Sequence, residues 1–312
     1  MRKKIDNSFR QNLTQMQTKQ KIQQLLAAAG TSPNKKLGQN FLIDLNLMQL
    51  LIDSAHIHPN DLVLEVGCAT GSLTQSLAEK AAHVIAVEYD DTLVKIAENQ
   101  LSDKDNITLL NTDILENKNT IASIVIDAIE KTRQTTSGQF ILIANLPYNT
   151  ASPLMMNLIT GEINIDRMHV TVQKEVADRM VAQPGTSSYG TLSILLAAVG
   201  NTKIERILKP TVFWPKPKVD SAIVTFIAEQ KKITQVRDKQ LLKQIIGLFM
   251  QHRRKMLKPC TKFAQKKLAQ IHNWSTVFED CGINPHDRPE QLSPEDFVSI
   301  ANICFEYLQK GK

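Results

Sequence analysis

The middle of the chain alternates between short apolar runs and longer amphipathic stretches, and this alternation limits the possible folds more than any other feature. The apolar runs are rich in Val and Ile and lie near residues 61–67, 83–88, 107–112, 140–145 and 168–173. The amphipathic stretches between them lie near residues 71–80, 91–101, 119–132 and 150–160. Parallel strands joined by crossover helices give this pattern, because a parallel sheet is buried on both faces. We therefore expect an α/β sheet with helices on both faces, completed at one edge by a hairpin of residues 203–208 and 219–227.

The chain is long enough for a second, smaller domain, since 42% of its 312 residues are hydrophobic. From Ile233 onward, apolar residues recur at helical spacing, as in Leu241, Leu242, Ile245, Ile246 and Phe249. Residues 229–234 predict a linker, and Ser293 before Pro294 is typical of the capped start of a last helix. We expect a basic arm or helix over residues 1–34, an α/β domain over 35–229 and a small all-α domain over 233–312.

Composition indicates a basic protein of a reducing compartment. Lys and Arg number 37 against 31 Asp and Glu, and the net charge of +6 suits a polyanionic partner without requiring one. The four cysteines lack Cys-x-x-Cys spacing, so we expect neither a metal site nor disulfides. No apolar run approaches the roughly 18 residues of a membrane span. We expect a cytoplasmic protein; its basic N-terminal arm is typical of a solvated tail, with a transit peptide or an RNA-contacting arm as alternatives.

Two glycines follow the first strand of the pattern. Gly67 and Gly71 lie in the turn between a strand and a helix, where small residues let a ligand press against the backbone. Glu88 stands 21 residues after Gly67, at the end of the second strand, where an acid would hydrogen-bond a ribose diol. The Gly-x-Gly-x-x-Gly phosphate motif is absent. The loop therefore favours a methyltransferase cofactor site over a dinucleotide site, with ordinary turn glycines as a third interpretation.

Asp113 ends the third strand, and its carboxylate could accept a hydrogen bond from an adenine amine of the cofactor. An isolated aspartate at a strand end is more often a helix cap. Here the position of Asp113 favours a contact with the cofactor, because three consecutive strand ends would face one crevice.

The fourth strand ends in Asn145-Leu-Pro147-Tyr148, and this tetrapeptide suits chemistry on an exocyclic amine. The N6 amine of adenine is a poor nucleophile because its lone pair is delocalised into the ring. The Asn145 carboxamide oxygen and a rigid backbone carbonyl next to Pro147 could accept its two hydrogens, and Tyr148 offers a face on which an extruded base can stack. Positioning then supplies much of the catalysis, without a strong general base. The alternative is a strand followed by a proline turn with a structural tyrosine.

These motifs resemble those of the KsgA-type ribosomal RNA adenine dimethyltransferases, from about Lys35 to the C-terminus. The matching segments are Lys36-Leu-Gly-Gln-Asn40-Phe-Leu42, Glu65-Val-Gly67, Val87-Glu88, Asp113-Ile-Leu, Asn145-Leu-Pro-Tyr148-Asn, Gln173-Lys-Glu-Val-Ala, Tyr189-Gly and Phe213-Trp-Pro-Lys-Pro-Lys-Val-Asp-Ser221. The resemblance implies a Rossmann-like, class I fold that binds S-adenosyl-L-methionine.

By this resemblance, the cofactor would be bound by residues from five parts of the chain. Asn40 and Leu42 would line its methionine end, Gly67 would back it, Glu88 would hold the ribose, Asp113 would read the adenine, and Asn145 would touch both cofactor and target amine. The family transfers four methyl groups to two adjacent adenosines in a hairpin near the 3′ end of small-subunit (16S) rRNA during assembly. The implied partner is therefore 16S rRNA or the immature small ribosomal subunit. We expect a monomer, because nothing in the sequence indicates an obligate interface.

Two departures from the family pattern stand out. Ala69 occupies a place where relatives commonly carry a glycine, which adds a Cβ near the cofactor, and the span from Asp113 to Asn145 is longer than usual. Phe213 precedes Pro215 and Pro217, whose fixed backbone angles should hold one loop shape. We expect Phe213 to be the second stacking face opposite Tyr148, with a buried core phenylalanine as the alternative.

Residues 251–267 contain seven Lys or Arg residues and no acid. Such a run would contact phosphates without reading sequence, although many charge runs are solvated helix faces. We expect RNA binding by Arg253, Arg254, Lys255 and Lys258.

Two rivals remain open at this stage. One is a large-subunit enzyme of the erythromycin-resistance type, and the other is a non-catalytic assembly or transcription factor that kept the fold. The motifs favour the small-subunit branch, and intact Asn145 and Tyr148 argue against a non-catalytic role.

Overall fold

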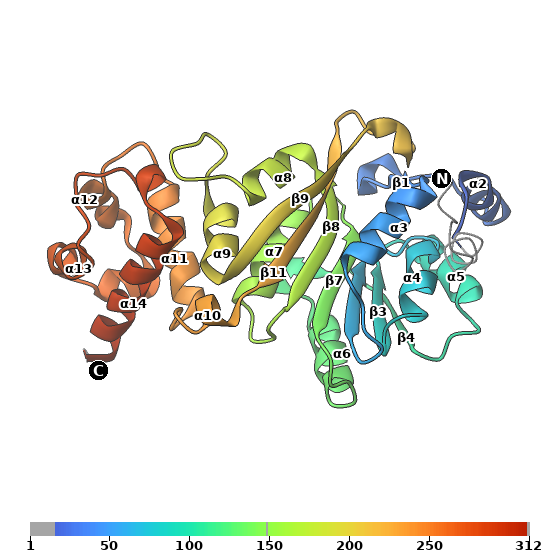
Figure 1. Ribbon diagram of the computed structural model, residues 1–312, viewed down its shortest axis with the longest axis horizontal. Helices are drawn as coiled ribbons and strands as arrows, with labels where there is room; N and C mark the ends of the chain where they lie inside the picture. The colour runs from blue at the N-terminus through green and yellow to red at the C-terminus, as the bar shows by residue number, and fades with distance from the viewer. Residues whose placement is uncertain (1–15, 148, 311–312) are drawn as a thin grey trace, which may run out of the picture. The chain divides into compact units, whose positions relative to one another are not determined.

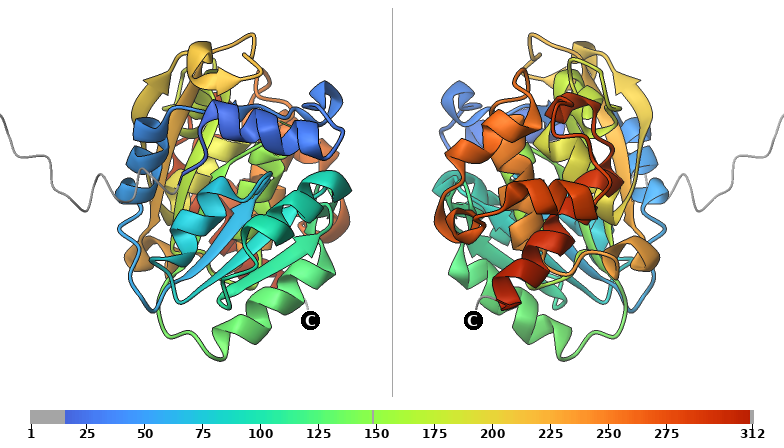
Figure 2. Two further views of the ribbon diagram at one scale, coloured as in Figure 1. Left: turned by 90° about the vertical axis from the view of Figure 1, so that its right-hand side faces the viewer. Right: turned by 90° about the vertical axis from the view of Figure 1, so that its left-hand side faces the viewer.

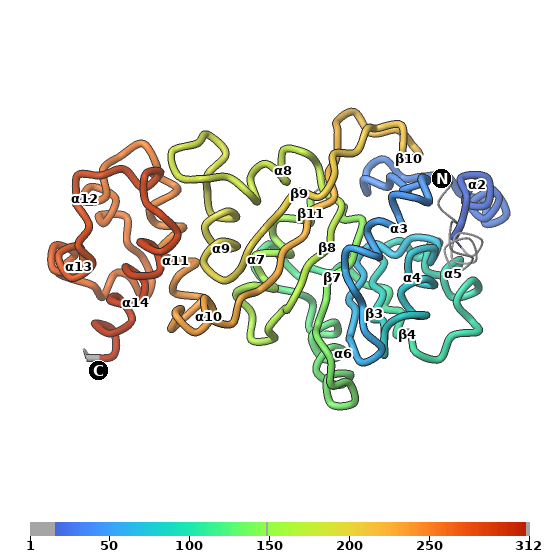
Figure 3. Tube along the Cα trace, in the orientation of Figure 1, coloured from blue at the N-terminus to red at the C-terminus, as the bar shows by residue number. Residues whose placement is uncertain are grey.

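The structure, a computed structural model, describes residues 16–147 and 149–310. Figures 1 and 3 show the course of the chain from the N-terminal helix to the C-terminal helix. Tyr148 and residues 1–15 lie outside the described residues, so the expectations for Tyr148 and for the first part of the basic arm are not addressed by it.

A seven-stranded, mostly parallel sheet forms the centre of the fold, with strand order β4-β3-β2-β7-β8-β11-β9. Its strands are β2 (Leu62–Val66), β3 (His83–Glu88), β4 (Ile107–Asn111), β7 (Phe140–Asn145), β8 (Arg167–Gln173), β9 (Gly200–Leu208) and β11 (Ser221–Ala228). The five expected strands are confirmed, and β2, β3, β4, β7 and β8 pair in parallel. The two later apolar runs form neighbouring strands at one edge, as expected. This order brings the ends of β2, β3 and β7 side by side.

The helices between β2 and β8 follow the expected alternation, and the structure adds helices before β2 and directly after β8 that this pattern did not predict. They are α2 (Lys19–Ala28), α3 (Leu45–Ser54), α4 (Ser72–Ala78), α5 (Asp91–Gln100), α6 (Ser123–Arg133), α7 (Ala151–Thr160), α8 (Lys174–Met180) and α9 (Thr191–Val199). The helix expected from residue 119 begins at Ser123, because Thr120–Ile121 (β6) pairs with Leu115–Asn117 (β5) in a small antiparallel hairpin. This hairpin accounts for part of the long span between Asp113 and Asn145.

The core of the sheet is apolar because its central strands are covered on both faces. All five residues of β2 are buried, and so are the first five of β7. Continuous burial of this kind is typical of parallel sheets. Glu65 is the one residue of β2 that is not apolar.

A separate two-stranded pairing joins distant parts of the chain. β1 (Phe41–Leu42) pairs antiparallel with β10 (Phe213–Trp214), with Phe41 opposite Trp214 and Leu42 opposite Phe213. The ring centroids of Phe41 and Trp214 are 6.0 Å apart in a stacked arrangement. This pairing places the segment around Asn40 beside the segment around Phe213.

The described chain forms two compact units whose boundaries differ from the expected ones. Among the described residues, unit 1 contains those up to Asn157 together with 165–177 and 204–225, and unit 2 contains 158–164, 178–203 and those from Phe226 onward. Unit 2 therefore includes α9 as well as the C-terminal helices. The segment expected to be the linker, residues 229–234, contains a short helix, α10 (Gln230–Ile233).

Unit 2 is helical. Its further elements are α11 (Lys239–Met250), α12 (Leu257–Cys260), α13 (Trp274–Asp280), α14 (Pro294–Lys310) and three 3₁₀ turns, Thr261–Phe263, Lys266–Gln270 and Pro289–Gln291. The expected capped start of the last helix is confirmed, because the Ser293 hydroxyl accepts from the Asp296 amide at 3.1 Å and the Asp296 carboxylate accepts from the Ser293 amide at 2.8 Å. Among the described helices, none combines the length and apolar character of a bilayer span.

Candidate active site and nucleic-acid surface

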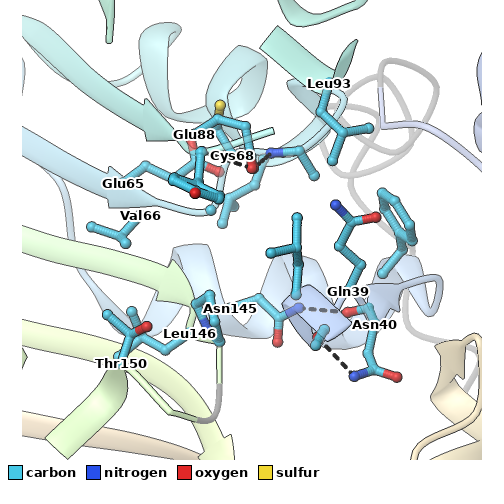
Figure 4. Close-up of a pocket in the computed structure, with 18 of the residues that line it drawn as sticks. Gln39, Asn40, Glu65, Val66, Cys68, Glu88, Leu93, Asn145, Leu146 and Thr150 are labelled. Carbon is cyan, nitrogen blue, oxygen red and sulfur yellow. Dashed lines mark hydrogen bonds between the residues drawn. The ribbon is translucent and has the colours of Figure 1, made fainter. Parts of the chain in front are cut away.

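A pocket of about 610 Å³ lies in unit 1 at the carboxyl ends of β2, β3 and β7. Figure 4 shows Glu65, Glu88 and Asn145 around it. All six residues expected to bind the cofactor line this pocket: Asn40, Leu42, Gly67, Glu88, Asp113 and Asn145. Of the expected catalytic residues, Asn145, Pro147 and Phe213 line it as well. Their individual roles remain predictions, but the fold brings them to one place.

The loop after β2 has a backbone that favours glycine at three positions. Gly67, Ala69 and Gly71 have φ values of 77°, 54° and 81°. A left-handed conformation costs an L-residue about 1–2 kcal/mol, whereas glycine adopts it without penalty. Ala69 therefore stands in a strained conformation, which a glycine at this position would avoid.

Glu88 binds the backbone on both sides of the pocket. Its Oε2 accepts from the Ala69 amide at 2.9 Å, and its Oε1 accepts from the amides of Tyr89 and Asp90 at 2.9 and 3.0 Å. Burial raises the pKa of this carboxyl group, and the three amide donors oppose that shift. Glu88 thus fixes the end of β3 relative to the glycine loop while its carboxylate borders the pocket.

Glu65 is a pocket residue that reasoning from the motifs did not single out. Only 2% of its surface is exposed, and its Oε2 has no hydrogen-bond partner among the described residues. Burial raises its pKa to about 8; the Thr74 hydroxyl beside it opposes this shift, and the nearby charge of Glu88 adds to it. An acid within the apolar run Leu62-Val-Leu-Glu-Val was the available signal, because a buried unpaired acid is costly unless it serves a ligand.

The Asn145 carboxamide is oriented by the segment around β1. Its Nδ2 donates to the Asn40 backbone carbonyl at 2.9 Å, while the Asn40 side chain donates to the Gly38 carbonyl at 2.9 Å (Figure 4). Because the amide NH2 group of Asn145 donates in this way, its Oδ1 is the atom that can accept a hydrogen bond from a ligand. This is the polarity that acceptance from an adenine amine requires.

Pro147 closes the pocket against the glycine loop. A Cβ added to Gly67 would lie 3.6 Å from Pro147 Cγ and Cδ, so this ring packs directly over the loop. The Pro147 carbonyl accepts from the amides of Thr150 and Ala151 at 3.1 and 3.2 Å, which starts α7 immediately after the motif. The turn around Pro147 is therefore held on both sides.

Phe213 fits both interpretations given to it, whereas Asp113 lines the pocket and caps a local turn instead of a helix. Phe213 lines the pocket but is only 4% exposed and packs in a core cluster with Leu42 and Met48. Asp113 lines the pocket, and its Oδ1 also accepts from the Leu115 amide at 3.0 Å, a local turn. Neither residue is excluded from ligand contact by these structural contacts.

Tyr89 is a second residue that the motifs did not indicate. It follows Glu88, lines the pocket, and leaves 59% of its surface exposed. An exposed aromatic ring beside a buried acid offers a flat face for a nucleoside. Its position directly after the strand-end acid was the only sequence signal available.

In unit 2, Arg253 is bound to other residues of the same unit, and its expected phosphate-binding role stays a prediction. Its Nε donates to the Glu290 carboxylate at 2.9 Å, and its two terminal nitrogens donate to the carbonyls of Thr186, Ser187 and Tyr189 at 3.0 Å. These bonds use four of the five donors of the guanidinium. Arg253 joins the loop before α9 to the turn at Glu290, and we assign it a structural role.

The other three expected RNA-binding residues, Arg254, Lys255 and Lys258, are exposed. Lys255 Nζ lies 4.5 Å from the centroid of the Phe263 ring, which stacks at 4.0 Å on His252. This group combines cations with a 43% exposed aromatic ring, a combination that suits nucleic acid. Within the described residues, no cluster of His, Cys, Asp or Glu suited to a metal ion is present.

Over most of its length the chain is similar to proteins of one family. The profile of the family "Ribosomal RNA adenine dimethylase" matches residues 30–306. A protein of Pediococcus pentosaceus named "Ribosomal RNA small subunit methyltransferase A" is 39% identical over 280 residues, covering 89% of this chain and 92% of that protein. A protein of the same name from Staphylococcus carnosus is 37% identical, with 86% and 88% of the two chains covered.

Two solved structures have a similar fold. A dimethyladenosine transferase from Plasmodium falciparum superposes with a TM-score of 0.64 at 23% identity, covering 85% of this chain and 96% of that one. The 23S rRNA methyltransferase ErmE superposes with a TM-score of 0.56 at 19% identity, covering 85% and 99%. At these identities the similarity concerns the fold.

Proposed function

Since the chain belongs to the ribosomal RNA adenine dimethylase family, we propose that it dimethylates the N6 amines of two adjacent adenosines in a hairpin near the 3′ end of 16S rRNA. The observation that carries this proposal is the orientation of the Asn145 carboxamide. Its amide nitrogen donates to the Asn40 carbonyl, and its oxygen can accept from a substrate amine. S-adenosyl-L-methionine is the methyl donor of this enzyme class. The curated relatives favour the small-subunit RNA over the large-subunit RNA, because their names specify the small subunit.

The pocket residues fit this cofactor by their chemistry. Glu65 has a buried carboxyl oxygen without a partner, and Glu88 borders the same pocket with a second carboxyl group. The cofactor carries an ammonium group, a sulfonium and a ribose diol, all of which favour acidic or acceptor groups. Gly67 lines the pocket, and a Cβ there would project toward the Pro147 ring at 3.6 Å. Asn40, Leu42 and Asp113 complete the set that we propose to hold it.

Catalysis is proposed to depend on alignment of the target amine. When bound, S-adenosyl-L-methionine supplies a methyl group activated by its sulfonium. The Asn145 oxygen and the Leu146 backbone carbonyl accept the two amine hydrogens, which localises the nitrogen lone pair and directs it away from the ring plane. Phe213 and Tyr148 are proposed to stack on the extruded base. Methylation makes the amine nitrogen acidic, so water can take its proton.

The experiment that tests this function is methyl transfer by the full chain from radiolabelled S-adenosyl-L-methionine to each ribosomal subunit, offered separately. We expect label in small-subunit RNA from unmodified particles, and a loss of about 10²–10³-fold in rate for Asn145→Ala. The control is Asn99→Ala, an exposed asparagine of α5. Label only in large-subunit RNA would support the erythromycin-resistance type of activity, and label in neither would support a non-catalytic role.

The partner at the level of assembly is also part of this proposal. We propose that the chain acts as a monomer on the immature small subunit, with Arg254, Lys255 and Lys258 contacting phosphates. Sedimentation of the protein with immature and mature particles at matched salt tests this part separately from the chemistry. Equal binding to mature small and large subunits would contradict it.

A further inference from the structure

The N-terminal segment 16–28 packs on the glycine loop of the cofactor pocket. This segment lies outside residues 30–306, the part of the chain that matches the family profile. It contains Gln17, a polar residue with only 4% of its surface exposed, and helix α2. Figure 2 shows α2 beside α5 in unit 1. The segment had been expected to be a solvated tail, an organelle signal or an RNA-contacting arm, and its contacts from residue 16 onward indicate another role.

Gln17 is bonded to two residues of the loop. Its Nε2 donates to the Thr70 carbonyl at 2.9 Å, the Thr70 hydroxyl donates to its Oε1 at 2.6 Å, and its backbone amide donates to the Ser72 hydroxyl at 3.0 Å. Thr70 and Ser72 both line the pocket and are themselves buried. Without Gln17, the Thr70 carbonyl and hydroxyl would each lose a buried partner.

The same segment also makes apolar contacts with Ala69, the loop residue before Thr70. Ile22 and Leu26 form a buried cluster with Phe41, Leu93 and Ile96, and Ala69 packs against this cluster. Ile22 also lines the pocket. The strained, left-handed Ala69 is therefore held from one side by α2 and from the other by the bond between its amide and Glu88.

From these contacts we propose that Gln17 is a positioning residue for the cofactor: it holds the loop of residues 67–72 in the conformation that binds S-adenosyl-L-methionine. The loop needs such support because three of its residues have left-handed φ values and one of these is an alanine. A loop that occupies its binding conformation only part of the time binds its ligand more weakly in proportion. The inference rests on the proposed cofactor role of the pocket and adds a determinant from outside the family profile.

The test is calorimetric titration of the full chain with S-adenosylhomocysteine, comparing Gln17→Ala, Gln17→Glu and the wild type. Gln17→Glu keeps the size of the side chain and removes the amide NH2 group that donates to the Thr70 carbonyl. We expect both variants to raise the Kd by about tenfold, which corresponds to a binding-competent fraction near one tenth. The matched control is Gln23→Ala, an exposed glutamine of the adjoining helix α2, which should leave the Kd unchanged.

A purely structural role is distinguished by steady-state kinetics and by a double-mutant cycle. If Gln17 positions the loop, KM for S-adenosyl-L-methionine rises while kcat at saturating cofactor and KM for RNA stay within about twofold of wild type. Thr70→Val combined with Gln17→Ala should weaken binding no more than the stronger single variant.

The outcomes that overturn the proposal are distinct from failure of the proposed function. A wild-type protein that does not bind S-adenosylhomocysteine would contradict the cofactor role of the pocket. A wild type that binds it, with Gln17 variants of lower melting temperature but unchanged Kd, would contradict the positioning role alone. The same holds if Gln23→Ala weakens binding as much as Gln17→Ala.

Discussion

At the scale of single residues, the pocket contains a carboxyl group that is expensive to ionise. Glu65 is buried in a parallel strand, and its pKa is raised to about 8 by burial. An unfolded chain ionises this group near pH 4.5, so between pH 4.5 and 8 the folded state binds more protons than the unfolded state. The stability of the cofactor-free protein therefore falls as pH rises through this range.

A cationic ligand reverses this penalty, which gives a testable pH dependence. S-adenosyl-L-methionine has a net positive charge and should favour ionised Glu65, so its affinity should increase from pH 6 to pH 8 with release of a proton. Titration in buffers of different ionisation enthalpy measures that release. S-adenosylhomocysteine lacks the sulfonium and should show a weaker trend, and Glu65→Gln should flatten the trend for both. An identical slope in wild type and variant would assign the titration to another group.

Arg253 and Arg254 are adjacent in sequence and are predicted to differ in function. Arg253 has its donors bound to Glu290 and to three carbonyls, whereas Arg254 is exposed. Arg253→Ala should lower the free energy of unfolding by about 2 kcal/mol, because the hydrogen bonds of the charged guanidinium to Glu290 and to the three carbonyls are lost. Arg254→Ala should change it by less than about 0.5 kcal/mol and weaken RNA binding instead. Denaturant unfolding and RNA titration of both variants measure the difference, and the reverse pattern would contradict the assignment.

At the scale of elements, strands were easier to predict than helices. The central strands are buried on both faces and therefore appear as continuous apolar runs. Helix α9 was not predicted because nearly all of its residues are buried, which removes the 3.6-residue periodicity by which a helix is recognised. The contacts of Arg253 could not be predicted from the sequence, because its partners lie 37 to 67 residues away along the chain.

The capped start of α14 allows a prediction for one element. Ser293→Ala removes the hydroxyl that accepts from the Asp296 amide and should lower the free energy of unfolding by about 1 kcal/mol. Ser293→Thr keeps a hydroxyl and should stay within a few tenths of a kcal/mol of wild type. Denaturant unfolding of the two variants tests this expectation. Equal losses would mean that packing at Ser293 matters more than the cap.

At the scale of the whole molecule, cofactor and RNA are proposed to use different units. The cofactor pocket is formed by residues of unit 1, and the basic residues 254–267 belong to unit 2. Changes to one set should therefore leave the affinity of the other ligand unchanged.

Charge reversal in unit 2 tests this separation. Arg254→Glu with Lys258→Glu should weaken RNA binding and reduce the slope of log K against log salt by about 0.7–0.9 for each lost phosphate contact. The Kd for S-adenosylhomocysteine should not change. Lys118→Glu with Lys131→Glu, both exposed in unit 1, makes the same change in net charge and serves as the control. A control that weakens RNA binding equally would show that only net charge matters.

The pairing of β1 with β10 has a consequence for how the enzyme is made. Phe213 forms part of the pocket wall and is positioned opposite Leu42, which is synthesised far earlier. At roughly 5–20 residues per second, translation from Leu42 to Phe213 takes on the order of 10–30 s. During that interval the nascent polypeptide has its glycine loop but lacks one wall of the site. Translation products truncated before Phe213 should be inactive for this reason, however well their first strands have folded.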